Sequence, residues 1–167
     1  MKYGEPGWKR GKRFERVGTF AVSAAPAAIF PLLCPVLEYD WIPDWRCTMR
    51  YSESGVAERD AVFTTPAAPG MEATWTTITY EPPHCIEYLI VQGTRAVIRL
   101  SLRLTATGNG GTEVEWRMLF TTMSRLAGHL TDRRFSETAF HAFLAERRAQ
   151  LEAYFAAVRG TSSKRVG

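Results

Sequence analysis

The chain has 167 residues, of which 46% are apolar, enough for one domain with a sizeable core that needs neither disulfides nor a structural metal. Its net charge of +4 comes from the ends, because residues 17–158 hold more acidic than basic side chains, and this argues against a nucleic-acid-binding face. No apolar run approaches the roughly 20 residues that cross a bilayer, and no signal peptide is recognisable, so we expect no membrane span and a cytoplasmic location.

The charge pattern divides the chain into three parts. We expect a basic tail at residues 1–13, a single domain at 14–158 and a second basic tail at 159–167. The three cysteines are odd in number and show no CxxC spacing, which favours small buried side chains over disulfides.

The first predicted elements are an edge strand and two short helical turns. Phe20 and Val22 alternate as in a strand, and Pro26 suits the first turn of a helix. Pro31 and Pro35 then keep the helices short. The segment that follows, which we call the lip, is rich in acidic and aromatic residues: Glu38, Asp40, Trp41, Asp44 and Trp45.

The middle of the chain predicts a series of antiparallel hairpins. Alternating or Thr-rich runs at 47–52, 61–65, 73–80, 85–92 and 95–105 are separated by turn sequences, with a loop at 66–70. The run at 95–105 places Ala96, Ile98, Leu100, Leu102 and Leu104 on one face. TGNGG at 107–111 is the strongest turn signal, and in the next strand Val114, Trp116, Met118 and Phe120 point to the same face.

One long helix is predicted at residues 132–158, after a lead-in turn at Leu126 and Leu130. Its apolar stripe matches the apolar face of the sheet. The order predicts an α+β helix-grip fold, in which a curved antiparallel sheet of about seven strands wraps around a long C-terminal helix.

These elements resemble the START-like, or SRPBCC, superfamily, which includes the polyketide cyclase/dehydrase and Bet v 1-like groups. The resemblance covers nearly all of residues 14–157. LLCPVLEYDWIPDW and YSESGVAERDAVFTT look like stretches of an uncharacterised bacterial branch, in which glycine is usual at the position of Asp44. The resemblance implies a cavity between sheet and helix for a hydrophobic molecule, and in some branches cyclisation or dehydration, without a catalytic residue common to the family.

The residues exclude several chemistries. No lysine lies between Lys12 and Lys164, which argues against a Schiff base on the domain. His84, His129 and His141 lack metal-binding spacing, and GNGG lacks the rest of a phosphate-binding loop. We expect no metal and no cofactor.

Arg147 is the polar residue that the helix periodicity singles out. It falls near the centre of the apolar stripe, where a guanidinium needs an acceptor from the lip or from a ligand. Pairing with Glu146 or a carboxylate of the sheet is the alternative, in which Arg147 serves the fold only.

Other candidate ligand-binding residues are apolar: Trp41, Trp45, Trp116, Met118, Phe120, Phe143 and Leu144. We expect one of Trp41 and Trp45 to face a pocket and the other to belong to the core. Glu38 and Asp44 are candidate polar anchors or general bases, although clustered acids are more often solvated or paired.

The sequence thus favours binding of a small hydrophobic or amphipathic molecule, such as a lipid or a polyketide-like compound. The main alternative is an enzyme of the cyclase, aromatase or dehydratase kind that uses a carboxylate of the lip or His141. A protein-interaction module with a filled core is the third hypothesis, and a homodimer is left open.

Overall fold

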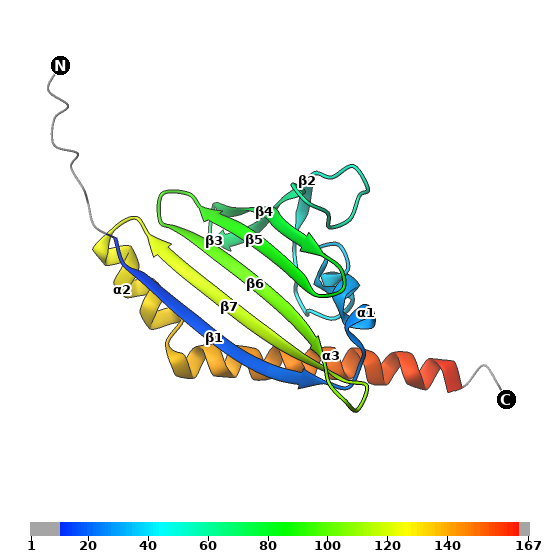
Figure 1. Cartoon of the computed structure of the whole chain (residues 1–167). Helices are drawn as coiled ribbons and strands as arrows, with labels where there is room; N and C mark the ends of the chain where they lie inside the picture. Colours follow the sequence, from blue (N-terminus) through cyan, green and yellow to red (C-terminus); the bar gives the residue numbers. More distant parts are fainter. Residues whose placement is uncertain (1–10, 164–167) are drawn as a thin grey trace, which may run out of the picture.

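The computed structural model describes residues 11–163 as one antiparallel sheet with helices against one face (Figure 1). The seven strands lie in the order β1-β7-β6-β5-β4-β3-β2. Their bounds are β1 Arg13–Val22, β2 Thr48–Tyr51, β3 Val62–Ala68, β4 Met71–Glu81, β5 Cys85–Gln92, β6 Ala96–Ala106 and β7 Thr112–Thr122. The helical segments are α1 Pro26–Ile29, the 3-10 turns η1 Phe30–Leu33 and η2 Glu38–Asp40, then α2 Arg125–Arg134 and α3 Glu137–Ser163. The predicted helix-grip fold is confirmed.

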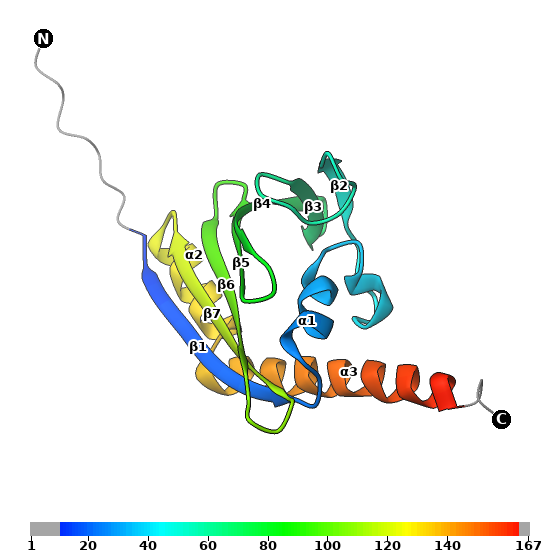
Figure 2. The same ribbon diagram turned by 45° about the vertical axis from the view of Figure 1, so that its right-hand side comes forward.

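The sheet curves so that β1 and β7 lie nearest to α3, whereas β2, β3 and β4 stand away from it (Figure 2). Its inner face is built by alternation, because every second residue of a strand points to the same side. The alternate positions of β6 and β7 are buried, with exposed fractions of 8% or less: Ala96, Ile98, Leu100, Leu102, Leu104, Val114, Trp116, Met118 and Phe120. The faces predicted for these two strands are therefore confirmed.

β1 is longer than predicted, because it pairs with β7 from Arg13 to Val22. Phe14 stacks on Phe120 with 4.7 Å between ring centroids. At Gly18, an added Cβ would lie 2.4 Å from Cδ1 of Leu144. The missing side chain at Gly18 thus lets α3 approach the edge strand.

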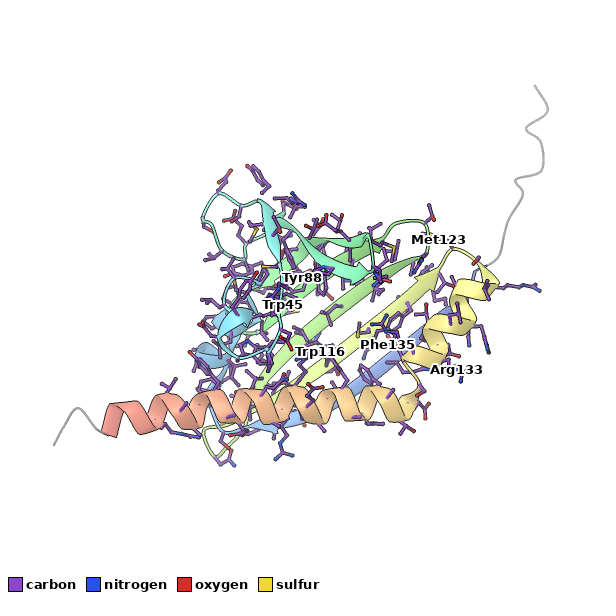
Figure 3. All side chains as sticks on the ribbon, turned by 180° about the vertical axis from the view of Figure 1, so that it is seen from behind. Trp45, Tyr88, Trp116, Met123, Arg133 and Phe135 are labelled. Carbon is purple, nitrogen blue, oxygen red and sulfur yellow. The ribbon has the colours of Figure 1, made fainter. Side chains whose placement is uncertain are left out.

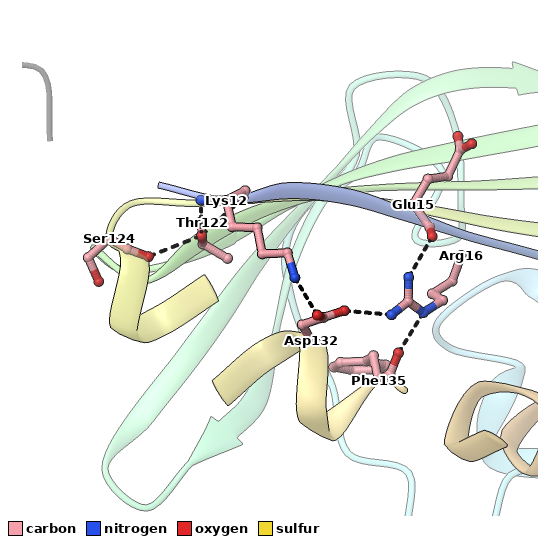
Figure 4. A network of polar contacts seen from close by, with 7 residues as sticks. All are labelled: Lys12, Glu15, Arg16, Thr122, Ser124, Asp132 and Phe135. Atoms are coloured by element: carbon pink, nitrogen blue, oxygen red, sulfur yellow. Dashed lines mark hydrogen bonds and ion pairs between the residues drawn. The ribbon is translucent and has the colours of Figure 1, made fainter. Parts of the chain in front are cut away.

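The long C-terminal helix predicted at 132–158 is present as α3, but its predicted start is wrong: α3 begins at Glu137, and a separate helix, α2, stands where only a lead-in turn was expected. The hydroxyl groups of Ser124 and Ser136 cap α2 and α3 by accepting from the N–H groups of Ala127 (3.1 Å) and Ala139 (3.3 Å). Asp132, the expected first residue, instead lies in α2, where it binds Lys12 and Arg16 (Figure 4). This network fastens α2 to the start of β1.

Other boundaries also differ from those expected. β3 continues through Pro66 to Ala68, where a loop was predicted. Proline is tolerated in this part of the strand because β2 pairs only with Val62, Phe63 and Thr64. Beside Pro66, the edge of β3 that faces away from β4 therefore has no neighbouring strand that needs an N–H donor. Arg13, at the end of the expected first tail, is in β1, and α3 continues to Ser163. Residues 1–10 and 164–167 of the expected tails lie outside the described residues.

In the part of the chain that the structure describes, no helix is both long enough and apolar enough to span a bilayer.

Candidate functional site

A cavity of about 900 Å³ opens between α2 and the β3–β4 hairpin. Asp44, Trp45 and Arg46 line it from the loop after η2, and Arg147 lines it from α3. Its other lining residues come from β3, β4, the end of β5, the β5–β6 turn, α2 and the residues beside α2: Thr65, Pro66, Ala67, Ala73, Trp75, Gln92, Arg95, Ser124, Leu126, Ala127, Leu130, Thr131, Arg134 and Phe135. Figure 3 looks onto this side of the molecule, where Trp45 and Phe135 lie above α3.

Aromatic rings build one wall of the cavity. Trp45 and Trp75 meet edge to face at 6.4 Å, and Trp75 stacks on Phe63 at 5.3 Å. Both indole N–H groups are already bonded, that of Trp45 to the carbonyl oxygen of Pro35 (2.8 Å) and that of Trp75 to Oγ1 of Thr65 (2.9 Å). The two rings therefore offer apolar surface at fixed orientations.

The structure separates the two tryptophans of the lip. Trp41 is 5% exposed and donates its indole N–H to the carbonyl oxygen of Leu32 at 2.7 Å, so it belongs to the core. Trp45 is half-buried and lines the cavity.

Several predicted contact residues lie in the core rather than at the cavity. Trp116, Met118, Phe120 and Leu144 are buried and none lines the cavity. Trp116 packs edge to face on Phe143 at 5.2 Å. Its indole N–H is buried and has no hydrogen-bond acceptor within residues 11–163.

Arg147 faces the cavity, as the helix periodicity predicted. Its guanidinium lies 4.9 Å from the ring centroid of Phe143, and Nη1 donates to Oε1 of Gln150 at 2.5 Å. Burial lowers the pKa of Arg147, while the negative charges of Glu146 and Glu38 oppose this shift. The residue stays cationic at neutral pH.

Glu38 is a buried carboxylic acid of the lip and is not among the residues that line the cavity. Its backbone N–H donates to the carbonyl oxygen of Cys34 (3.0 Å), and its carbonyl accepts from Ile42 (2.8 Å), so the turn that carries it is fixed. Burial raises the pKa of Glu38 to about 8, although the positive charge of Arg147 partly opposes the rise. Glu38 is therefore mostly neutral at pH 7, unlike the solvated acid that clustered carboxylates usually provide.

Asp44 differs from Glu38 in both exposure and backbone. It is exposed at the cavity mouth and has a φ of 58°, in the left-handed region that glycine adopts most easily. This conformation explains physically why glycine suits this position.

The histidines take no part in the cavity. His141 lies on the exposed face of α3, and His84 and His129 are also exposed, so the expectation that His141 acts on a cavity-bound substrate is wrong. No group of three or more His, Cys, Asp or Glu residues suited to a metal occurs among the described residues.

Sequence reasoning missed the contribution of α2 and of three arginines. Leu126 and Leu130 share a helix face and are 70% and 58% exposed, yet both line the cavity. Their spacing in the sequence predicts only a lead-in turn. Arg46, Arg95 and Arg134 come from distant segments, so no sequence spacing connects them.

Comparison with known families assigns this architecture. A family model described as polyketide cyclase/dehydrase and lipid transport matches residues 14–156. The chain belongs to this family. No curated protein matches the chain.

Solved structures of the same fold have low sequence identity to this chain. Norcoclaurine synthase from Thalictrum flavum, solved with dopamine and hydroxybenzaldehyde, aligns with a TM-score of 0.61 and 11% identity over 83% of this chain and 86% of the synthase. Protein MLL2253 from Mesorhizobium loti gives 0.61 and 15% over 84% and 98%, and Ms6760 from Mycobacterium smegmatis gives 0.57 and 16% over 83% and 88%. At these identities the likeness shows the fold alone.

Proposed function

We propose that this protein binds a small amphipathic molecule in the cavity between α2 and the β3–β4 hairpin, in the cytoplasm. The observation that carries the proposal is the cavity itself, whose volume of about 900 Å³ suits a small molecule. Trp45, Trp75 and Phe135 provide aromatic walls, and the exposed leucines of α2 would lose contact with water when a ligand fills the space. The family description includes lipid transport, which agrees with such a ligand.

An uncharged, environment-sensitive dye such as Nile red tests this proposal. We expect saturable binding to the folded protein, quenching of tryptophan fluorescence and displacement by amphipathic compounds. Replacing both Leu126 and Leu130 by serine should weaken dye binding, since both line the cavity. Val56→Ser is the control, because Val56 is 41% exposed and lies outside the cavity. Equal binding by all three proteins would contradict the proposal.

Glu38 supports an enzyme of the cyclase, aromatase or dehydratase kind as the second candidate. Glu38 does not itself line the cavity, but its carboxyl group interacts electrostatically with Arg147, which does. A carboxylic acid that holds its proton at neutral pH can act as a general acid on a substrate that reaches past Arg147, whose guanidinium would stabilise negative charge on that substrate. Mass spectrometry of small molecules that co-purify with wild type and with Glu38→Gln tests this role. A compound chemically converted only in the wild type supports catalysis, and identical compounds in both samples contradict it.

A further inference from the structure

Positive charge is concentrated around the cavity. Arg46, Arg95, Arg134 and Arg147 reach it from four separate segments, and Asp44 is the one acidic residue among its described lining residues. Residues 11–163 as a whole contain 16 basic and 16 acidic side chains. The excess of arginine at the cavity is therefore a local feature and does not follow from the composition of the folded body.

Ion pairing distinguishes these four arginines from four others among the described residues. In the described structure none of them forms an ion pair, whereas four other arginines do: Arg16 with Asp132, Arg50 with Glu72, Arg99 with Glu87, and Arg117 with Glu15 and Glu115. The contacts of the cavity arginines are of other kinds. Arg134 lies over the ring of Phe135 at 5.8 Å, Arg147 lies over Phe143, and Arg46 has only a 3.5 Å contact to the carbonyl oxygen of Trp45.

The backbone holds the arginines of the mouth near the apolar face of α2. The N–H of Met123, just before α2, donates to the carbonyl oxygen of Arg95 at 2.8 Å, which ties the β5–β6 turn to the start of the helix. Arg134 is the last residue of the same helix, and Arg46 follows Trp45 of the aromatic wall. Charged donors thus border the same space that the tryptophans and leucines line.

We propose that the ligand is an amphipathic anion. Its carboxylate or phosphate group contacts Arg46, Arg95 and Arg134 at the mouth, and its apolar part lies against Trp45, Trp75 and the leucines of α2. Guanidinium groups bind both kinds of oxyanion through paired N–H donors, which explains the choice of arginine at a site that recognises an anion. This inference rests on the proposed function, since it requires that the cavity hold a ligand.

The test compares compounds that share a chain and differ in head group: dodecanoate, dodecyl phosphate and dodecanol. Titration calorimetry measures each anion below its micellar concentration and the alcohol below its solubility limit. We expect one or both anions to bind at least about tenfold tighter than the alcohol at low salt. The difference should shrink at 0.5 M salt because screening weakens exposed charge pairs. The anion that binds more tightly identifies the head group.

Two triple variants with the same change in net charge locate the effect. The variant Arg46→Gln, Arg95→Gln and Arg134→Gln should lose roughly the tenfold preference for the anions and bind dodecanol as before. The control replaces Arg59, Arg103 and Arg125, which are exposed, form no ion pair in the described structure and do not line the cavity. The control should keep the preference. All six side chains are exposed, so both variants should fold, which circular dichroism can verify.

Each contrary outcome has a distinct meaning. If neither anion binds more tightly than dodecanol, or if the preference survives the first triple variant, the anionic ligand is overturned and the proposed function still stands. Absence of binding by all three compounds, together with no binding of the uncharged dye, overturns both proposals. Binding to vesicles that contain an anionic lipid is measured for the wild type and the first variant as well. If the variant binds these vesicles more weakly but keeps its preference for the soluble anions, the arginines serve a membrane surface and the inference is wrong.

Discussion

Glu38 shows how a single buried acid makes the stability of the fold depend on pH. A carboxyl group with a pKa near 4.5 in the unfolded chain and about 8 in the folded protein binds its proton more tightly when folded. Stability therefore falls as the pH rises from 4.5 to 8, because the unfolded state releases the proton first. Below pH 4.5 both states are protonated, so Glu38 carries no such cost there.

Glu38→Gln should remove this pH dependence, since the amide stays neutral in a similar shape. Above pH 8 the variant should be more stable than the wild type by on the order of 4 kcal/mol, and the two should differ little near pH 4. Urea denaturation between pH 4 and pH 9 measures the difference. Parallel stability profiles would show that Glu38 ionises as freely in the folded protein as in the unfolded chain.

Trp41 and Trp116 offer a matched pair of buried indoles. The N–H of Trp41 is bonded to Leu32, whereas that of Trp116 lacks an acceptor in the described structure. Trp41→Phe should cost about 1–2 kcal/mol more than Trp116→Phe, because only the first leaves a buried carbonyl oxygen without its donor. Denaturant unfolding of both variants gives the comparison. Equal losses would indicate that the N–H of Trp116 also has an acceptor.

Individual residues could be predicted only where periodicity determines direction. Helical spacing placed Arg147 on the inward face of α3 without any tertiary information. The same reasoning could not distinguish Trp41 from Trp45, because an irregular segment has no period. Nor could it show that Glu38 is neutral, since that pKa depends on burial by distant parts of the chain.

Among the elements, α2 matters most because it forms one side of the cavity and packs closely on the sheet. At Gly128, an added Cβ would lie 2.6 Å from Cβ of Lys12 and 2.9 Å from Oγ1 of Thr122. That hydroxyl is itself bonded to the backbone of Lys12. Glycine at this position therefore allows α2 to lie against the start of β1.

Gly128→Ala and Gly160→Ala should change stability in opposite directions. Alanine favours a helix by up to about 1 kcal/mol over glycine, but at Gly128 the clash with Lys12 and Thr122 should outweigh this gain by about 1–2 kcal/mol. Gly160 lies in α3 with open space around it, so only the helical preference acts there. Thermal unfolding of the two variants provides the test. Stabilisation by both would show that α2 is free to move away from the sheet.

The elements differ in how well the sequence predicted them. β5 was placed correctly, and the inner faces of β6 and β7 were assigned correctly, because strict alternation between turn signals leaves little choice of register. The predicted first strand was too short because Arg16 and Gly18 interrupt the apolar face of β1. In the structure, Arg16 forms an ion pair with Asp132 of α2, and the missing side chain of Gly18 lets α3 approach the strand. α2 was missed because its apolar face is short and is not packed on the core. Leu126 and Leu130 remain exposed, so this helix lacks the long apolar stripe that marks a buried helix in a sequence.

At the scale of the whole molecule, the fold follows from patterns along the chain, whereas the cavity depends on where the curved sheet leaves space. α2 and the β3–β4 hairpin are distant in sequence and meet at the cavity only in the folded chain. Neither the volume of the cavity nor the grouping of its four arginines can be recognised in the sequence. The family resemblance predicted that a cavity exists, while the residues around it came from the structure.

A ligand that spans the cavity should couple these two walls. Dodecanoate at about 100 times its dissociation constant should stabilise the protein by about 2.7 kcal/mol and raise the melting temperature by roughly 5–10 °C. Local openings of α2 would then require release of the ligand, so amide exchange in α2 should slow by up to about 100-fold. The turn at residues 107–111 is the internal control. It lies at the opposite end of β7 from α2, and none of its residues lines the cavity. Its exchange by local opening should be unchanged. Protection at this turn without protection of α2 would mean that the ligand binds elsewhere on the molecule.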